Sequence, residues 1–250
     1  MKIMYRKKFK ISVLIASMVI VFSSCSKDDD NPSSGNATNG KTTAVFSSGV
    51  TYGTLTDQDG NVYKTVTIGT QTWMAENLRT TKYNDGTSIT YVTSASEWEG
   101  LTTEAYCNYN NTISKDTIVT YGRLYNWYAV NTGKLAPEGW HIPTYAEWST
   151  LPDYLGAESV AGGKLKETGT THWISPNTGA TNETGFTALP GGYRSFNGTF
   201  YYVGDYGYWW SSTEGGTYGA DYRGMDYNDC YLYRGNGYKE LGFSVRCVRD

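Results

Sequence analysis

From Phe186 onward, tyrosine and tryptophan recur in short runs that glycine interrupts every few positions. Runs of this length and glycine content do not favour helices, whereas aromatic side chains fit the pleated surface of strands. The 250-residue chain contains 23 Tyr, 8 Trp and 29 Gly, so the sequence predicts an irregular, loop-rich sheet and argues against a helical bundle. The candidate strands of this part are residues 208–213, 220–225, 230–234 and 243–249.

Two further strands are expected earlier in the chain, at residues 52–56 and 62–68. Residues of the second strand alternate with the period of a half-buried strand. Between them lies the segment DQDGN (57–61), whose turn-forming residues favour a hairpin. The two acids of this segment could instead begin a small calcium loop, but the remaining ligands of an EF-hand are missing. We therefore expect a hairpin.

Three short helices are expected in the middle of the chain. Apolar residues at helical spacing indicate one helix within residues 122–130. Thr144 and Glu147 form a capping box, which places the start of a second helix at Thr144, and Pro152 should kink or interrupt it. A third helix is expected at residues 160–167. Few helices followed by many strands predict an α+β domain.

The first 24 residues are organised like an export signal. Residues 2–10 carry five cations, and residues 11–22 form an apolar run that is too short for a transmembrane helix. Small residues then precede Cys25, an arrangement that resembles the lipobox of bacterial lipoproteins. The alternative is an ordinary secretory signal cut near Ser24. We expect a lipid on Cys25, an anchor to membrane lipid that needs no further membrane segment.

An acidic run and a polar stretch follow this cysteine. Residues 28–30 are Asp-Asp-Asp, which is similar to the signal that sends lipoproteins of Bacteroides-type bacteria to the outer face of the outer membrane. A solvated tether, with the protein on the periplasmic side, is the alternative. Residues 31–48 are rich in Asn, Ser, Gly and Thr and cannot bury enough apolar surface to order themselves. The chain is therefore divided into a signal peptide (1–24), a lipidated cysteine with a flexible tether (25–50) and one folded domain (51–250).

The charge distribution argues against nucleic acid as a partner. Five of the 21 basic residues lie in the first ten positions, so the rest of the chain carries 16 basic and 24 acidic residues. Binding to phosphates requires a cationic surface, which this balance does not supply. The acidic excess is typical of a soluble surface.

Six segments of the folded part occur in a recognisable order: DQDGNVYKTVTIGTQTWMAENLR (57–79), YGRLYNWYAV (121–130), APEGWHIPTYAEWSTL (136–151), GFTALPGGYRS (185–195), GYWWSST (207–213) and GFSVRCVRD (242–250). Together they resemble the Fibrobacter succinogenes major paralogous domain, a family abundant in lipoproteins of Bacteroides-type and Fibrobacter-type bacteria. The family has no established activity, so the resemblance implies a fold more than a function.

A more distant resemblance concerns two of these segments. Residues 141–148, HIPTYAEW, are similar to the R-L-P-T-E-A-E-W segment of formylglycine-generating enzymes, and residues 242–246 are similar to their G-F-R terminus. Those enzymes have a C-type-lectin-like fold. The resemblance therefore implies a divergent C-type-lectin-like α+β domain whose long loops present binding surfaces.

The cysteines other than Cys25 are Cys107, Cys230 and Cys247. Export makes a disulfide chemically reasonable. The family pattern implies a bond between Cys107 and Cys247, with Cys230–Cys247 as the alternative, and leaves one thiol over. An enzymatic dithiol is not favoured, because Cys230 and Cys247 lie 17 positions apart whereas the formylglycine enzymes use two close cysteines.

No constellation of catalytic or metal-binding residues stands out. His141 and His172 are the two histidines, and neither lies at metal-ligand spacing from another ligand. His141 directly precedes a predicted helix, where we expect a packing or capping role. We therefore expect no enzymatic activity, no cofactor and no metal. Residues 116–118, Asp-Thr-Ile, resemble a short O-glycosylation motif of exported Bacteroides-type proteins, with Thr117 as the acceptor.

Aromatic residues are the best functional candidates, because rings with a polar group suit both sugar faces and protein hot spots. Of the adjacent Trp209 and Trp210, alternation in a strand would point one inward and one outward. The sequence predicts a non-catalytic, surface-exposed module that binds glycan or protein. The alternatives are a structural or adhesin-type assembly component and an oxidase-like enzyme related to formylglycine generation. The candidate ligand-binding residues are Tyr201, Tyr202, Tyr206, Tyr208, Trp209, Trp210, Tyr227 and Tyr231.

Overall fold

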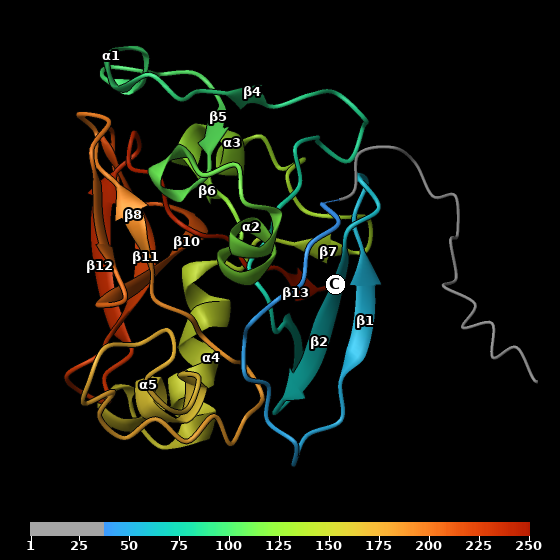
Figure 1. The fold of residues 1–250 in the computed structure, drawn as a ribbon, viewed down its shortest axis with the longest axis vertical. Helices are drawn as coiled ribbons and strands as arrows, with labels where there is room; N and C mark the ends of the chain where they lie inside the picture. Colours follow the sequence, from blue (N-terminus) through green and yellow to red (C-terminus); the bar gives the residue numbers. More distant parts are fainter. Residues whose placement is uncertain (1–37) are drawn as a thin grey trace, which may run out of the picture. The chain divides into compact units, whose positions relative to one another are not determined.

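The computed structural model of the protein describes residues 38–250. The predicted signal peptide and Cys25 lie outside the described residues. Helices and strands are mixed along the described part, which confirms the α+β class (Figure 1). No helix within this part is both long and apolar enough to cross a membrane.

One antiparallel sheet is built from the beginning and the end of the described chain. Its strand order is β1-β2-β3-β13-β7. The strands are β1 (Gly53–Thr56), β2 (Val62–Ile68), β3 (Gln71–Met74), β13 (Val248–Arg249) and β7 (Trp140–His141). The predicted hairpin is confirmed, because Thr56 pairs with Val62 across the turn. The strand predicted at 243–249 is reduced to its last two residues.

A second sheet carries the aromatic part of the sequence and lies on the left of Figure 1. Its order is β12-β11-β10-β8-β9. The strands are β8 (Gly191–Arg194), β9 (Phe200–Val203), β10 (Tyr206–Glu214), β11 (Gly219–Asp226) and β12 (Tyr233–Tyr238). Three of the predicted strands correspond to β10, β11 and β12, although β12 begins later than expected.

A small third sheet and four short helical segments lie between residues 90 and 131. The strands are β4 (Thr90–Tyr91), β5 (Ala105–Cys107) and β6 (Leu124–Tyr125), and the helices are α1 (Ala95–Trp98), the 3-10 helix η1 (Tyr109–Asn111), α2 (Lys115–Tyr121) and α3 (Trp127–Asn131). The helix predicted at 122–130 begins later than expected because residues 124 and 125 pair with β5. The side chain of Asn126 caps α3 by accepting from the amide of Ala129.

Helices α4 (Tyr145–Leu155) and α5 (Glu158–Leu165) correspond to the other two predicted helices. Both hydrogen bonds of the capping box between Thr144 and Glu147 are present. The helix α4 runs through Pro152 to Leu155, so the predicted interruption is not observed. Trp148 of α4 packs 4.7 Å, centroid to centroid, from Trp73 of β3 and donates to the carbonyl of Trp210 in β10. This helix therefore joins the two large sheets.

The strand β10 is covered on both faces where it passes through the core. Trp209 packs in one cluster with Trp73 and Trp148, and Trp210 packs in another with Trp127. Both β10 tryptophans are fully buried. Toward the start of β10 one face of the strand is no longer covered, and Tyr206 and Tyr208 on that face are only partly buried.

Residues 38–50, which we call the N-terminal strap, lie against the folded domain and run beside α2 in Figure 1. The amide of Thr43 donates to Oγ1 of Thr120 in α2, and Oγ1 of Thr43 lies 2.9 Å from Nε2 of His172. The amide of Val45 donates to the buried carboxylate of Glu167. Phe46 and Val50 add apolar contacts with the core. The prediction of a flexible tether is therefore wrong for residues 38–50, because these groups anchor the segment.

Candidate functional site

An open pocket of about 530 Å³ lies on the exposed face of the second sheet, within the size range of small-ligand sites. Its floor is aromatic: Tyr208 comes from β10, Tyr222 from β11 and Tyr193 from β8. Phe243 completes the floor, with its ring stacked at 5.1 Å on that of Tyr208. We call this pocket the aromatic groove.

Glycines opposite two of these rings leave space for the rings over the neighbouring strand. Tyr222 pairs with Gly235 of β12, and Tyr208 pairs with Gly224 of β11. A Cβ atom on Gly235 would lie 2.5 Å from Cζ of Tyr222, far inside van der Waals contact. A Cβ atom on Gly224 would lie 3.4 Å from Cδ1 of Tyr208, which is ordinary contact. The Tyr222 ring thus occupies the space that the missing side chain of Gly235 leaves.

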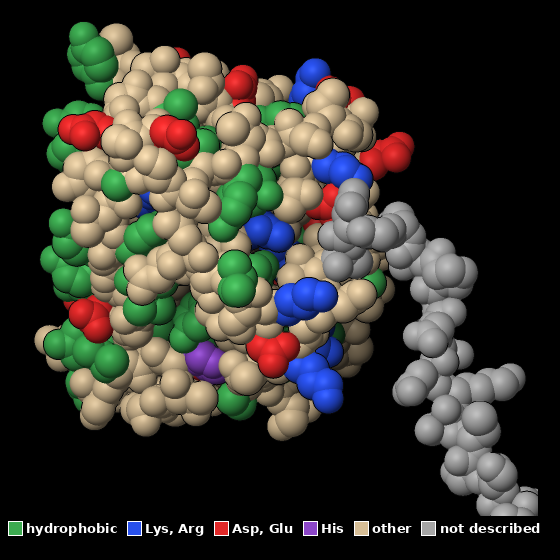
Figure 2. All heavy atoms as spheres, turned by 45° about the horizontal axis from the view of Figure 1, so that its top comes forward, with side chains coloured by type: hydrophobic (Ala, Val, Ile, Leu, Met, Phe, Trp, Pro, Cys, Tyr) green, Lys and Arg blue, Asp and Glu red, His purple; other side chains and the backbone are tan. Residues whose placement is uncertain are grey.

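Three exposed rings form the rim of the groove. Tyr218 precedes β11 and is 76% exposed, Tyr238 ends β12, and Phe196 follows β8. The rings of Phe196 and Tyr238 meet edge to face at 5.9 Å. The same three residues also line a smaller neighbouring hollow of about 350 Å³, which Glu240 borders. These three rim residues therefore line both hollows. In Figure 2, where tyrosine is coloured with the hydrophobic residues, such side chains gather along the left edge, the side on which this sheet lies.

The aromatic groove is uncharged. None of the described residues that line it is acidic or basic, and its non-tyrosine polar side chains are Ser195 and Asn236. Burial raises the pKa of Tyr193, Tyr208 and Tyr222 above the ordinary tyrosine value. Their hydroxyl groups therefore stay protonated at neutral pH and can donate as well as accept hydrogen bonds. The surface combines apolar ring faces with neutral polar groups.

The structure places the predicted ligand-binding residues in different surroundings. Tyr208 lies in the groove. Tyr201, Tyr202 and Tyr206 lie beside it, in ring contact with Tyr193 or Tyr208. These four are the predicted residues that the structure brings together.

The remaining predicted residues lie elsewhere. Trp209 and Trp210 are both buried, so the expectation that one of them points outward is wrong. Their indole nitrogens donate to Oδ1 of Asn77 and to the carbonyl of Tyr125. The physical reason is that β10 lies between two core clusters at this point, so either face of the strand is inside. Tyr227 packs against the core, and Tyr231 stacks on Tyr233 outside the groove.

Several groove residues were not among the predicted binding residues. Tyr193 and Phe243 lie in segments of the family resemblance, and Phe196 directly follows one of these segments. Tyr222 could have been found, because in a hairpin of β10 and β11 it shares a face with Tyr208. Phe196 and Phe243 carry no such signal, since their positions depend on contacts between distant segments.

The predicted disulfide between Cys107 and Cys247 is not formed: Cys107, Cys230 and Cys247 are free thiols. Cys107 lies in β5 in a cluster with Trp98, whereas Cys247 precedes β13 in the main core cluster. Burial raises the pKa of the Cys107 thiol to about 12 and raises that of Cys247 as well. The two thiols lie in different parts of the core, which explains why they are not bonded to each other. The alternative bond between Cys230 and Cys247 is not formed either.

Both histidines are hydrogen-bonded to neighbouring carboxylates. His141 lies 2.7 Å from Oε1 of Glu147 and 2.6 Å from Oδ1 of Asp250, so it supports the capping box of α4. His172 lies 2.7 Å from Oε2 of the buried Glu167. Within residues 38–250, no group of three or more His, Cys, Asp or Glu side chains is arranged to hold a metal ion.

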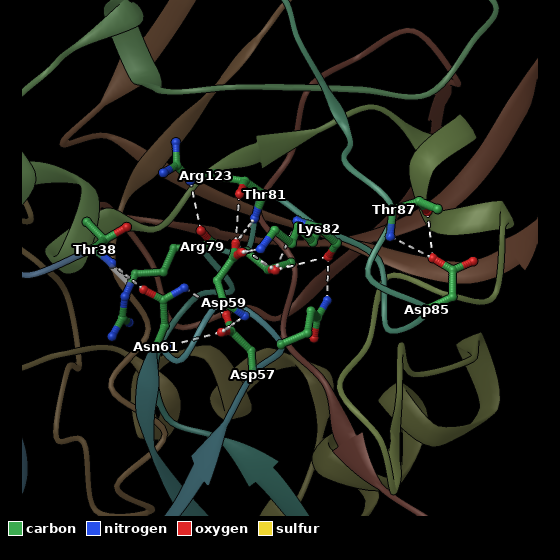
Figure 3. Close-up of polar contacts among 12 residues, drawn as sticks. Thr38, Asp57, Asp59, Asn61, Arg79, Thr81, Lys82, Asp85, Thr87 and Arg123 are labelled. Atoms are coloured by element: carbon green, nitrogen blue, oxygen red, sulfur yellow. Dashed lines mark hydrogen bonds and ion pairs between the residues drawn. The ribbon is translucent and has the colours of Figure 1, made fainter. Parts of the chain in front are cut away.

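The two acids of the 57–61 turn are occupied by protein donors, as Figure 3 shows. Oδ1 of Asp57 accepts from the amides of Asp59 and Asn61, both at 2.9 Å. Asp59 accepts from the hydroxyl of Thr81 at 2.8 Å, and its other oxygen lies 3.5 Å from Nζ of Lys82. These contacts are those of a hairpin that is attached to residues 80–82, as predicted in preference to a calcium loop.

The comparison with protein families gives one result: the family model described as Fibrobacter succinogenes major domain matches residues 66–249. The chain belongs to this family. No curated protein and no solved structure matches the chain. The C-type-lectin-like fold expected for this Fibrobacter succinogenes major domain thus remains a prediction.

In this Fibrobacter succinogenes major domain, segments used for the resemblance meet in the core. Nε of Arg246 donates to Oδ1 of Asn77, which also accepts from the indole of Trp209. The guanidinium of Arg246 lies 4.2 Å from the ring centroid of Phe186, and its burial lowers its pKa to about 9. These four residues come from four different segments of the resemblance. The shared sequence therefore maintains the fold, while the groove gains its rim from Tyr218 and other residues outside those segments.

Proposed function

We propose that this protein is a non-catalytic binding module for neutral glycans, held on the outer face of the outer membrane by a lipid on Cys25. The observation that carries this proposal is the uncharged, tyrosine-floored groove on the second sheet. None of the described residues lining it is His, Cys, Asp or Glu, the side chains most often used for acid–base catalysis. Membership in a family abundant in lipoproteins supports the location.

The groove suits a sugar ring for two physical reasons. A pyranose has an apolar face of C–H groups, which can cover a flat aromatic ring, and a polar edge of hydroxyls. The rings of Tyr208 and Tyr222 offer apolar surface, and their neutral hydroxyls and the amide of Asn236 offer partners for the polar edge. A sugar acid would gain no ion pair here, because the lining contains no cation.

Affinity electrophoresis tests this function with gels that contain hydroxyethyl cellulose, xyloglucan, galactomannan, mixed-linkage glucan or dextran. We expect at least one of these neutral polysaccharides to retard the protein. Tyr222→Ala and Tyr218→Ala should each abolish most of the retardation. The matched control is Tyr154→Ala, because Tyr154 is 66% exposed and lies on α4, away from the groove. The proposal fails if no polysaccharide retards the protein, or if the control variant loses as much as Tyr218→Ala.

The anchor has its own test. Cells grown with a labelled fatty acid should incorporate the label into the wild-type protein and not into Cys25→Ala. Protease accessibility on intact cells would then separate the outer face from the periplasmic side. Label in the Cys25→Ala variant would refute lipidation at this residue without affecting the groove.

A further inference from the structure

We propose that the groove is one end of a longer binding surface, and that the ligand is an extended neutral polysaccharide chain whose next units lie over Tyr202 and Tyr206. This inference rests on the proposed function, because it assigns a second subsite to the same glycan. Its evidence adds observations made outside the groove. It consists of a continuous row of rings, a strained tyrosine backbone and the charges beside the row.

The rings continue from the groove without a gap. From Tyr222 to Tyr208 the centroids are 5.7 Å apart, from Tyr208 to Tyr206 5.8 Å, and from Tyr206 to Tyr202 5.2 Å. Tyr193 connects the same two regions, since it lines the groove and its ring lies 6.0 Å from that of Tyr202. Each step is close to the length of one sugar unit. A chain leaving the groove in this direction would stay on aromatic surface.

The backbone of Tyr202 is in the left-handed region, with φ of 64°. This conformation is unfavourable for a bulky side chain and is normally taken by glycine or asparagine. Directly opposite, between the pairs that join β8 and β9, the chain has Gly192, also at positive φ. The other non-glycine residues at positive φ in the described part are asparagines and Thr187.

The positive φ of Thr187 has a structural explanation that Tyr202 lacks. It is buried, its amide donates a hydrogen bond to Oδ1 of Asn182, and its carbonyl accepts from Arg246. Tyr202 is 48% exposed, and its ring packs on other tyrosines. A residue with a strained backbone whose side chain lies on the surface is typical of a binding position. The ring at position 202 thus lies at a position where a glycine would give a more relaxed backbone.

The charges beside this row favour a neutral chain. Burial and the carboxylate of Asp226, which is hydrogen-bonded to Tyr206, raise the pKa of the Tyr206 hydroxyl. Asp205 lies in the turn that follows Tyr202, and its amide donates to the Tyr202 carbonyl. Two carboxylates at this end can accept hydrogen bonds from sugar hydroxyls, whereas they repel uronic acids. The surface thus selects against acidic polysaccharides.

The test uses oligosaccharides of two to eight units prepared from whichever polysaccharide of the panel retards the protein, with calorimetry as the readout. Wild-type affinity should rise with chain length until the second subsite is filled. Tyr202→Ala should lower affinity for the longest oligosaccharide about five- to tenfold and leave that for the shortest unchanged. Tyr202→Gly should show the same loss although it relieves the backbone strain, which separates the role of the ring from that of the turn. Tyr222→Ala should weaken binding at every length.

The outcomes separate this inference from the proposed function. If wild-type affinity is independent of length, or if Tyr202→Ala weakens short and long ligands equally, the second subsite is refuted while the groove remains. If none of the panel binds the wild type, both ideas fall. Preference for polygalacturonic acid over the neutral probes would overturn the choice of ligand class.

Discussion

The substitution Gly235→Ala should damage the groove without replacing any residue that lines it. The new methyl group would lie 2.5 Å from Cζ and Oη of Tyr222. Carbon atoms pack best at about 3.5–4.0 Å, so the end of the ring must move by about 1–1.5 Å. Because this ring is the end of a side chain that borders open space and can move, the substitution should lower the free energy of unfolding by only about 1 kcal/mol. Because the displaced ring changes the shape of the groove floor, glycan affinity should fall about tenfold.

Gly224→Ala is the matched control, since it adds the same methyl group to the neighbouring strand. Its new atom would lie 3.4 Å from the nearest atom of Tyr208 and should leave the floor in place. Calorimetric titration with the retained glycan measures affinity, and urea unfolding measures stability. A Gly235→Ala protein that binds as tightly as the wild type would refute the argument that this glycine positions the ring. Equal losses in the two variants would show that the effect is general to the sheet.

Three further predictions concern the core and its surroundings. Glu167→Gln should lower the free energy of unfolding by about 1–3 kcal/mol in urea titration, because the charged acceptor shared by the Val45 amide and His172 becomes a neutral amide with one acceptor oxygen. Partial burial lowers the pKa of His141, but hydrogen bonds to two carboxylates outweigh burial and raise it. Its stabilisation is therefore complete below about pH 6.5 and disappears as the pH rises through the raised pKa, and thermal unfolding of His141→Gln should lack this dependence. In the native protein iodoacetamide should modify Cys230 faster than Cys107 and Cys247, and all three should react after unfolding without reductant, as mass spectrometry can show.

Each of these experiments has a result that would contradict it. Glu183→Gln is the control for the buried acid, because Glu183 is exposed and pairs with Lys164 at the surface. An equal loss in both variants would show that burial of Glu167 is unimportant. A His141→Gln protein with the wild-type pH profile would assign the dependence to other groups. Finding a single reactive cysteine after unfolding without reductant would restore the disulfide predicted from the family pattern.

Local signals in the sequence predicted local structure well. The capping box at Thr144 and the DQDGN turn each depend on residues only a few positions apart, and both form as expected. The predictions that one of Trp209 and Trp210 points outward and that Cys107 bonds to Cys247 were wrong. They depend on what covers β10 and on where β5 lies relative to β13. The composition of the N-terminal strap predicted a flexible tether, but the backbone amide of Val45 and the hydroxyl of Thr43 contact the buried side chains of Glu167 and His172. A single sequence does not show such long-range partners.

The candidate site was predicted in kind and only partly in place. The aromatic, glycine-rich C-terminal part indicated the sheet that holds the groove and included Tyr208 among the candidates. The groove itself required the pairing of Tyr222 with Gly235, which the sequence reveals only once the strand register is known. Phe243 reaches the floor because its segment pairs with residues of β6 and lies beside β10.

The attachment of the first hairpin decides where the gene can be cut. The family match begins at residue 66, inside β2, so a fragment trimmed to that boundary would lose β1 and the first half of β2. Arg79, which is almost fully buried, would then lose the carbonyl of Val62 and the ring and hydroxyl of Tyr63. A buried guanidinium that has lost these contacts is strongly destabilising. The shortened edge of the sheet would also be open to pairing with other molecules. Fragments for expression should therefore start before residue 38, and those that start at residue 66 should be recovered as aggregates.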